Sequence, residues 1–315
     1  MSLLVIVIVI VALAAPVLVY RRSIWTVGAV TALALVVAVG GLPARGPAAT
    51  VPVPLLVAIR GAEHGDVDRV VFEFRGGLPR KTHVAYVPAL TQDGSGLPIP
   101  MAGRAILEVR VQLASAHDQR GRSTAPNALT LPLRNVMQVK RAGDFEAVVS
   151  YGIGVAQRQP FRVTTLRNPD RIVVDIDHHF ATVARRVFFM NLPNFQVGRE
   201  PEVTLVLRWV PATTPATGVM DRLFAGPTAT ESARGLRLVA SEATGFANLS
   251  ISSGVARVRL TGGCASHGST FTIANEIGPT LQQFAGVVSV KILDPQGTTG
   301  NPTGLTPSLP DCLEP

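Results

Sequence analysis

Four residues of the types that bind metal ions lie close together in the chain. They are Asp175, Asp177, His178 and His179, and the two aspartates would share one face of a strand. Carboxylate and imidazole groups are ligands for divalent cations. The sequence offers no third, distant ligand motif, and a polar strand face that runs into a loop accounts for the same residues. We therefore expect no bound metal here.

A histidine and an aspartate that could act as a base and its orienting acid occur at His117 and Asp118. Covalent catalysis would also need a nucleophile held in a defined turn, and the chain contains no G-x-S-x-G sequence. Cys264 is a poor nucleophile if it is oxidised. The sequence therefore predicts no catalytic residue and no cofactor.

Charged side chains on predicted strands offer a different chemistry, which is the binding of anions. Arg69 and Arg75 bracket one alternating segment, and Asp175 and Asp177 lie on the polar face of another. Guanidinium groups can hold carboxylates or phosphates bidentately. Outside a cell these anions belong to wall polymers and lipid head groups. We predict these four residues as a candidate binding surface, with solvated surface charges as the alternative explanation.

The chain has two cysteines, Cys264 and Cys312. In an oxidising compartment an even pair indicates a disulfide. Closing a loop of this length would stabilise the fold by about 4 kcal/mol in the chain-entropy model. The alternative is two independent free thiols.

Composition limits the class of protein. The 315 residues are 47% hydrophobic and 16% charged, with a net charge of +8. An unfolded polyelectrolyte is excluded by the high apolar fraction. The excess of arginine is spread along the chain without a basic run, which argues against nucleic-acid binding. The length suits two modest domains.

Residues 1–44 are almost entirely apolar. Two uncharged runs, 3–20 and 24–42, flank the pair Arg21–Arg22, and each is long enough to span a bilayer as a helix. Because arginines stay cytoplasmic, we expect residues 46–315 to be exported from a protein held at the cell membrane. Alternatively, the second run is the apolar core of a signal peptide. The first run is then a genuine helix or an artefact of a start codon placed too far upstream.

A Pro/Ala-rich linker, residues 45–54, leads into a β-rich region over 55–180. Apolar and polar residues alternate over 70–75, 107–113 and 172–177, which is typical of strands with one buried face. Turn sequences separate such segments. We predict about eight strands and no helix, and hence a β-sandwich-like domain.

Residues 201–293 change to a mixed pattern. Their periodicity predicts the order strand–helix–strand–strand–helix–strand, with the helices over 213–225 and 271–284. This order indicates a small α+β domain with helices on one face of a sheet. Residues 181–200 are predicted to join the two domains. The Pro/Gly-rich tail, 294–315, would depend on the disulfide for its order. The expected fold class is thus mainly β plus α+β.

The β region also resembles a known family. Five segments occur in the order found in the AMIN-like domain of exported actinobacterial envelope proteins. They are DRVVFEFRGGLP (68–79), SAHDQRGR (115–122), AGDFEAVVSYGIGV (142–155), PFRV (160–163) and DRIVVDIDH (170–178). The resemblance implies an envelope-targeting module that binds peptidoglycan or envelope partners. It also implies that SAHD is a turn motif, in which Asp118 binds backbone N–H groups.

The C-terminal region is similar to the GerMN domain of sporulation and germination proteins. The segments that carry this similarity are LFAGPT (223–228), GVARVRLTG (254–262) and TLQQFAGVVSVKI (280–292). This chain departs from the pattern of that family after the strand: it has Gly262, Gly263 and Cys264 where the family usually has apolar or acidic residues. The resemblance implies a role in cell-wall or germination complexes without a known catalytic activity.

Taken together, the sequence predicts a non-enzymatic, membrane-tethered envelope protein. Its expected partners are a cell-wall polymer or envelope proteins, and the membrane through the N-terminal runs, but no nucleic acid. Two alternatives remain. One is a cell-wall hydrolase or a direct activator of one, and the other is a structural subunit of an envelope assembly.

Overall fold

The computed structural model describes residues 53–315. The two predicted apolar spans in residues 1–44, and most of the predicted linker, therefore lie outside the described residues. Among the helices of residues 53–315, none has the length and apolar character needed to cross a membrane.

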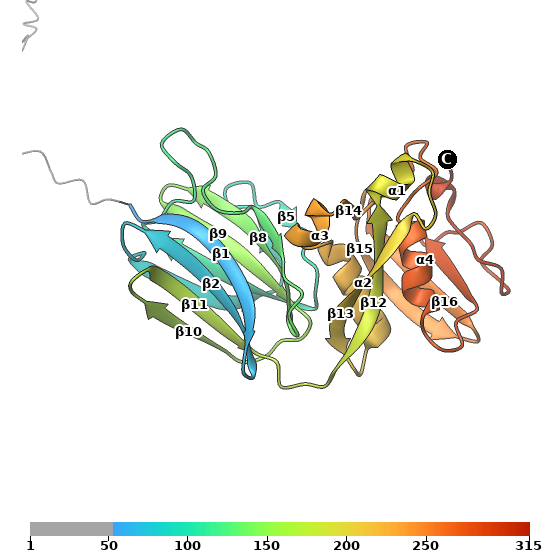
Figure 1. Cartoon of the computed structure of the whole chain (residues 1–315), viewed down its shortest axis with the longest axis horizontal. Helices are drawn as coiled ribbons and strands as arrows, with labels where there is room; N and C mark the ends of the chain where they lie inside the picture. Colours follow the sequence, from blue (N-terminus) through green and yellow to red (C-terminus); the bar gives the residue numbers. More distant parts are fainter. Residues whose placement is uncertain (1–52) are drawn as a thin grey trace, which may run out of the picture. The chain divides into compact units, whose positions relative to one another are not determined.

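The first domain is built from strands and, within residues 53–180, contains no helix. In chain order its strands are β1 (Leu55–His64), β2 (Val67–Arg75), β3 (Lys81–Val87), β4 (Leu90–Thr91), β5 (Pro98–Ile99), β6 (Ala105–Gln112), β7 (Ala128–Thr130), β8 (Val136–Phe145), β9 (Val148–Val155), β10 (Phe161–Leu166) and β11 (Asp170–Asp177). Two antiparallel sheets, with strand orders β1-β2-β11-β10 and β3-β6-β9-β8-β7, face each other (Figure 1). The sandwich predicted from alternation is confirmed.

The core of the sandwich forms where the alternating apolar faces of the two sheets meet. Phe72 on β2 is 2% exposed and packs edge-to-face on Tyr151 of β9, with ring centroids 5.8 Å apart. On β6 the alternation predicted over 107–113 stops at Val111, the last buried residue of the strand. Leu113 is 44% exposed because β6 ends at Gln112 and Leu113 adopts a positive φ of 55°, which turns the chain. Ala114 is buried in the core instead.

The second domain begins earlier than the sequence predicted. Its strands are β12 (Thr182–Asn191), β13 (Val203–Pro211), β14 (Leu236–Arg237), β15 (Ala243–Ser252), β16 (Val255–Gly262) and β17 (Ser289–Leu293). They form two three-stranded sheets, with orders β13-β12-β14 and β15-β16-β17. The segment 181–200, predicted to join the domains, thus contains a central strand. Val187 and Phe189 of β12 are fully buried, which explains why this segment folds as part of the sheet.

Helices lie against both of these sheets. They are α1 (Leu192–Gln196), α2 (Pro215–Ala225), α3 (Ala229–Ala233) and α4 (Ala274–Gln282), followed by a short 3₁₀ helix over 311–313. The helices predicted over 213–225 and 271–284 correspond to α2 and α4. Both contact strands of the two sheets, α2 touching β12 and β15 and α4 touching β12 and β17 (Figure 1). The expected single sheet is therefore replaced by two sheets that share the helices.

Side chains of α4 and the residue after it cover one backbone edge of β12. Glu276 accepts a hydrogen bond from Met190 N at 2.9 Å, and Thr280 accepts one from Phe188 N at 3.1 Å. Gln283 accepts a third hydrogen bond from Arg186 N, the next outward-facing N–H group of β12, at 2.9 Å. These side chains replace a neighbouring strand, because they bind N–H groups that would otherwise lack a partner.

The two domains belong to one compact unit over residues 51–315, and Arg222 of α2 ties them together. Arg222 is 1% exposed, and its guanidinium donates to the backbone carbonyls of Leu131 and Val136 at 3.1 and 3.0 Å. It also binds the carbonyls of Leu133 and Arg134. One buried cation therefore holds the loop that precedes β8.

Candidate functional site

The residues of the predicted binding surface do not form one site: Arg69 and Asp175 pair with each other, whereas Arg75 lies apart from them. Arg69 and Asp175 lie directly opposite each other on β2 and β11. Arg69 donates from Nε and Nη2 to the two carboxylate oxygens of Asp175 at 2.7 and 2.8 Å. The hydrogen bond with Asp175 raises the pKa of Arg69. This pair neutralises itself, so neither residue is available to an outside ligand.

Arg75, by contrast, is exposed at the end of β2 and lines a cavity of about 690 Å³. We call this the arginine cavity. Its lining comes from the start of β1, the end of β2 and the loop 115–123: Val53, Leu55, Arg75, Ser115, His117, Asp118, Gln119 and Arg120. Within the part of the chain that the structure describes, neither Arg75 nor Arg120 has an ion-pair partner.

The loop 115–123 is shaped by Asp118. One carboxylate oxygen of Asp118 accepts from the backbone N–H groups of Arg120 and Arg122 at 2.9 and 3.0 Å. The other oxygen accepts from Arg122 Nε at 2.9 Å. The backbone hydrogen bond from Arg122 is the main cause that lowers the pKa of Asp118. This is the turn role that the family resemblance implied, and the carboxylate of Asp118 binds Arg122 and not the side chain of Arg120.

His117 lies beside this loop and is held by Asp144 of β8. His117 Nδ1 is 2.7 Å from Asp144 Oδ2, and the other oxygen of Asp144 accepts from Ala116 N at 3.1 Å. Ser115 Oγ is 3.1 Å from the same Nδ1 atom. A Ser–His–Asp triad needs the serine and the aspartate on opposite ring nitrogens. The three residues therefore do not form that catalytic arrangement, and Nε2 of His117 is free of Asp144.

A second and larger cavity, of about 970 Å³, shares His117 with the first. We call it the dyad cavity, after His117 and Asp144. Arg141 contributes one wall, where its guanidinium donates to Ser123 Oγ at 3.1 Å and lies 3.7 Å from Asp144. Phe145 at the rim is 72% exposed. A Cβ atom at Gly143 would overlap the carboxylate of Asp93, so only glycine fits at that position of the wall.

The remaining sequence-predicted residues take structural positions. His178 Nδ1 lies 2.9 Å from a carboxylate oxygen of the fully buried Asp68. Asp177 and the exposed His179 are 3.7 Å apart. Among residues 53–315, no group of three or more acidic, histidine or cysteine side chains is arranged to hold a metal ion.

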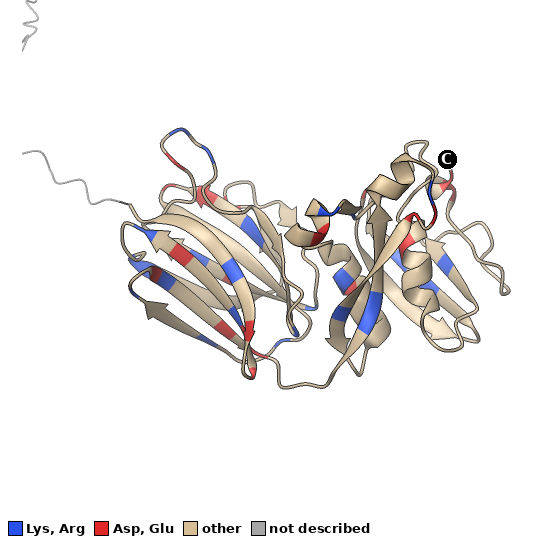
Figure 2. Ribbon diagram, viewed as in Figure 1, with Lys and Arg blue, Asp and Glu red and all other residues tan. Residues whose placement is uncertain are grey.

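The sequence analysis identified Arg75 but not Arg120, Arg141 or Asp144 as site residues. Arg120 stands in the SAHDQRGR segment, which was interpreted only as a turn, so its position was the available signal. Asp144 precedes an apolar strand, and nothing local indicates that it reaches His117. Figure 2 shows basic and acidic residues interspersed over the sandwich, so the site is a local pair of arginines and not a continuous basic face.

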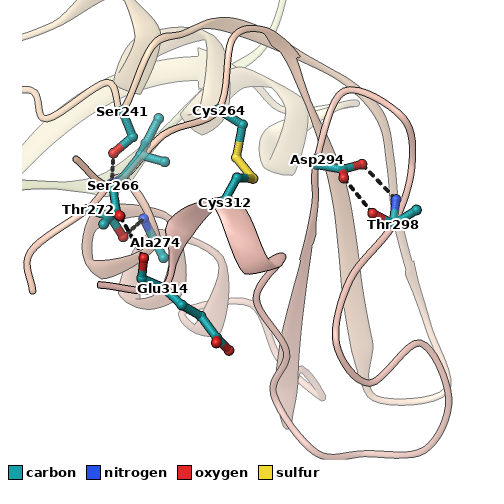
Figure 3. Close-up of a disulfide and its surroundings, with 10 residues drawn as sticks. Ser241, Cys264, Ser266, Thr272, Ala274, Asp294, Thr298, Cys312 and Glu314 are labelled. Carbon is teal, nitrogen blue, oxygen red and sulfur yellow. Dashed lines mark hydrogen bonds between the residues drawn. A yellow bond between two sulfur atoms is a disulfide. The ribbon is translucent and has the colours of Figure 1, made fainter. Parts of the chain in front are cut away.

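The disulfide of the second domain is present as predicted. Cys264 and Cys312 are joined, with their Cα atoms 5.7 Å apart (Figure 3). The disulfide and two hydrogen bonds beside it fasten the C-terminal tail. Ser266 N donates to Cys312 O at 2.7 Å, and Ser266 Oγ donates to Glu314 O at 2.6 Å. The tail 294–315 is thereby packed against the domain.

Comparison with known proteins identifies two families along the chain. Residues 54–178 match the AMIN-like domain family, and residues 186–294 match a family described as sporulation and spore germination. No curated protein and no solved structure matches the chain. The order of the two matches is the one that the sequence motifs indicated, and the combination suggests an envelope- or sporulation-related protein.

Proposed function

Because the chain consists of an AMIN-like domain followed by a sporulation and spore germination domain, we propose that it is an envelope protein that binds an anionic cell-wall polymer through the arginine cavity. AMIN-like domains are associated with envelope and peptidoglycan interactions. The proposal adds a ligand chemistry and a site to that association.

The observation that carries the proposal is that two guanidinium groups in one cavity have no ion-pair partner among the described residues. Arg75 and Arg120 line one cavity, whereas Arg69 on the same strand as Arg75 is already held by a carboxylate. Guanidinium groups bind phosphate and carboxylate groups through paired hydrogen bonds. A polymer that carries such groups along its length would meet Arg75 and Arg120 together.

The dyad cavity supports the same proposal, because it would extend the binding surface beyond the arginines. His117 borders both cavities, and Arg141 adds a third guanidinium. The exposed ring of Phe145 gives an apolar face on which part of a polymer could pack. We propose binding without turnover, since the serine beside His117 shares Nδ1 with Asp144 and is not placed as a nucleophile.

We further propose that residues 46–315 lie outside the cytoplasm, with the N-terminal apolar runs holding the protein at the membrane. The arginine pair Arg21–Arg22 between the runs supports this orientation. Ser123 is exposed, and the two native cysteines are joined in a disulfide. In a Ser123→Cys variant, an impermeant thiol reagent should label Cys at that position in intact cells. Protection until the cells are lysed would contradict the orientation.

Retention of the purified full chain on isolated cell wall tests the ligand. An Arg75→Ser/Arg120→Ser variant should lose at least about tenfold in affinity, because each charge-assisted hydrogen bond contributes about 1.5–3 kcal/mol. Retention of the unmodified chain should also fall as salt rises from about 0.15 M to 1 M, where the Debye length shortens from about 8 to 3 Å.

The control removes the same charge elsewhere. Arg162 and Arg167 are exposed on and beside β10, at the edge of the sheet opposite β1. An Arg162→Ser/Arg167→Ser variant should be retained like the unmodified chain. Equal losses for both double variants would reduce the effect to net charge and refute the site. Release of soluble fragments from the wall material would instead favour the hydrolase alternative.

A further inference from the structure

A separate cavity of about 530 Å³ lies in the second domain, bordered by α4, β17 and the disulfide-linked tail. We propose that this cavity binds a neutral sugar unit that carries hydroxyl and acetamido groups. The site is independent of the arginine cavity, because it is formed only by residues of the second domain. Its lining includes Thr270, Thr272, Asn275, Gly278, Gln282, Asn301, Ser308, Leu309 and Glu314.

The polar groups of this cavity are nearly all uncharged. Among the described residues that line it there is no lysine or arginine, and Glu314 has the one ionisable side chain. Phosphate-rich or carboxylate-rich ligands would therefore find no cation, unlike in the arginine cavity. Amide and hydroxyl side chains present both donors and acceptors, which is the pattern that matches sugar hydroxyl and acetamido groups.

Three side-chain amides have hydrogen-bonding capacity to spare. Asn275 accepts from Thr272 N at 2.9 Å through Oδ1, which leaves its NH₂ group without a partner among the described residues. The side chains of Gln282 and Asn301 make no hydrogen bond within residues 53–315. Each of these amides could bind a ligand without breaking a contact that the fold uses.

The cavity also has an apolar side. Leu309 is 37% exposed, and the buried residues Val290, Ile292 and Leu313 lie beneath it. Binding sites for small molecules combine an apolar lining with a few placed polar groups, in cavities of roughly 300–1,000 Å³. The volume and the lining of this cavity both fall in that class.

Gly278 shows that the space is kept open. It lies within α4, where glycine is less favourable than alanine. Its φ is not in the left-handed region, and a Cβ atom placed there would meet no heavy atom within 4 Å. Packing within the described residues therefore does not explain the absence of a side chain at Gly278. Pro279 follows Gly278, and a proline restricts the backbone of the residue before it. A Gly278→Ala control therefore separates this backbone effect from the effect of filling the cavity.

The wall opposite α4 depends on the tail. The fully buried Lys291 donates from Nζ to the carbonyls of Thr303 and Thr306 at 3.0 and 2.8 Å. These hydrogen bonds hold the loop that contains the two threonines, which follows β17 in the chain, against that strand. The disulfide fixes Cys312 next to Leu313 and Glu314, both of which line the cavity (Figure 3). Reduction of the disulfide should therefore remove binding at this site.

Calorimetric titration of the purified full chain with the β-1,4-linked dimer of N-acetylglucosamine tests the proposal. Cellobiose, which has the same linkage without acetamido groups, should bind at least about tenfold more weakly, since tenfold corresponds to 1.4 kcal/mol and to roughly one hydrogen bond. Gly278→Leu should abolish binding of the acetamido sugar by filling the cavity, while Gly278→Ala retains it.

Two amide variants locate the contacts. Asn275→Asp keeps the acceptor for Thr272 N but removes the donor, and Asn301→Ala removes an amide that has no partner among residues 53–315. Each should weaken binding of the N-acetylglucosamine dimer about tenfold. Gln296→Ala, an exposed amide outside the lining, is the control and should change nothing. No measurable binding, equal binding of both sugars, or full binding by Gly278→Leu would overturn the proposal.

Discussion

The two domains line their cavities with different chemistry. The first domain places Arg75, Arg120 and His117 around one cavity, whereas the second surrounds its cavity with side chains such as Asn275 and Asn301. Charged groups attract anions over a distance, and salt weakens this attraction, whereas amides bind a ligand only at hydrogen-bond range. Under the two proposals above, the cavities bind different parts of an envelope polymer, and we expect that either binding can be lost without the other.

The domains also differ in how they hold buried acids. In the first domain, Asp68 is fully buried and accepts from two backbone N–H groups, at 2.6 and 2.7 Å, as well as facing His178. In the second, Glu276 is buried with two backbone donors, Met190 N and Val239 N, and no cation of residues 53–315 forms an ion pair with it. Burial raises the pKa of Glu276 to about 8. The second domain is therefore the one whose stability should respond to mildly alkaline pH.

Removing the disulfide should have the largest effect on stability, and the two domains should differ most clearly in their response to it. A Cys264→Ser/Cys312→Ser variant is expected to lose about 4 kcal/mol of unfolding free energy, because the bond closes a long loop. Hydrogen exchange resolved along the sequence should show the loss in residues 182–315, while retention on cell wall persists. Faster exchange spread evenly over both domains would contradict their independence.

Replacing Arg222 tests the connection between the domains. Arg222→Met should destabilise the protein by about 3 kcal/mol, because several buried carbonyls of the loop before β8 lose their donor. Calorimetry should then resolve two separate unfolding transitions, whereas those of the unmodified chain are expected to overlap. The exposed Arg167 offers the comparison, and Arg167→Met should stay within about 0.5 kcal/mol. A single transition in Arg222→Met would show that other contacts suffice.

The pH response of Glu276 is the smallest of these effects. Its carboxyl has an ordinary pKa of 4.5 in the unfolded chain and about 8 in the folded protein, so the folded state keeps a proton that the unfolded chain releases. The resulting stabilisation is complete below about pH 4.5 and is lost as the pH rises through about 8. Between pH 7 and 9 the loss should be about 1 kcal/mol.

Urea unfolding at several pH values measures this loss. Glu276→Gln should flatten the dependence between pH 7 and 9, because glutamine does not ionise and still offers one acceptor. An unchanged slope in the variant would mean that another group causes the dependence.

Local pattern was enough to predict the sandwich, since Val70, Phe72 and Phe74 occupy every second position of one strand and face the core. It was not enough for β12, where Phe188 and Phe189 are adjacent and Arg185 and Arg186 precede them, so that no clean alternation identifies the strand. The two-sheet arrangement of the second domain depends on which helix contacts which strand, and periodicity carries no such information.

The candidate site was predictable only in part, for a similar reason. Exposed arginines were expected, but Arg69 is paired with Asp175, a residue 106 positions away, through the register of β2 and β11. Such pairing is set by the assembled sheet and is invisible in sequence. Arg75 and Arg120 come together because loop 115–123 lies beside the end of β2, which again depends on tertiary packing.

The central claim is that the arginine cavity recognises the anionic polymer of the wall. The most direct measurement compares retention of the full chain on isolated wall before and after its phosphate- and carboxylate-bearing polymers have been stripped chemically. We predict that stripping reduces retention of the unmodified chain to the level of the Arg75→Ser/Arg120→Ser variant and does not reduce that variant further. Undiminished retention of the unmodified chain on stripped wall would contradict the claim.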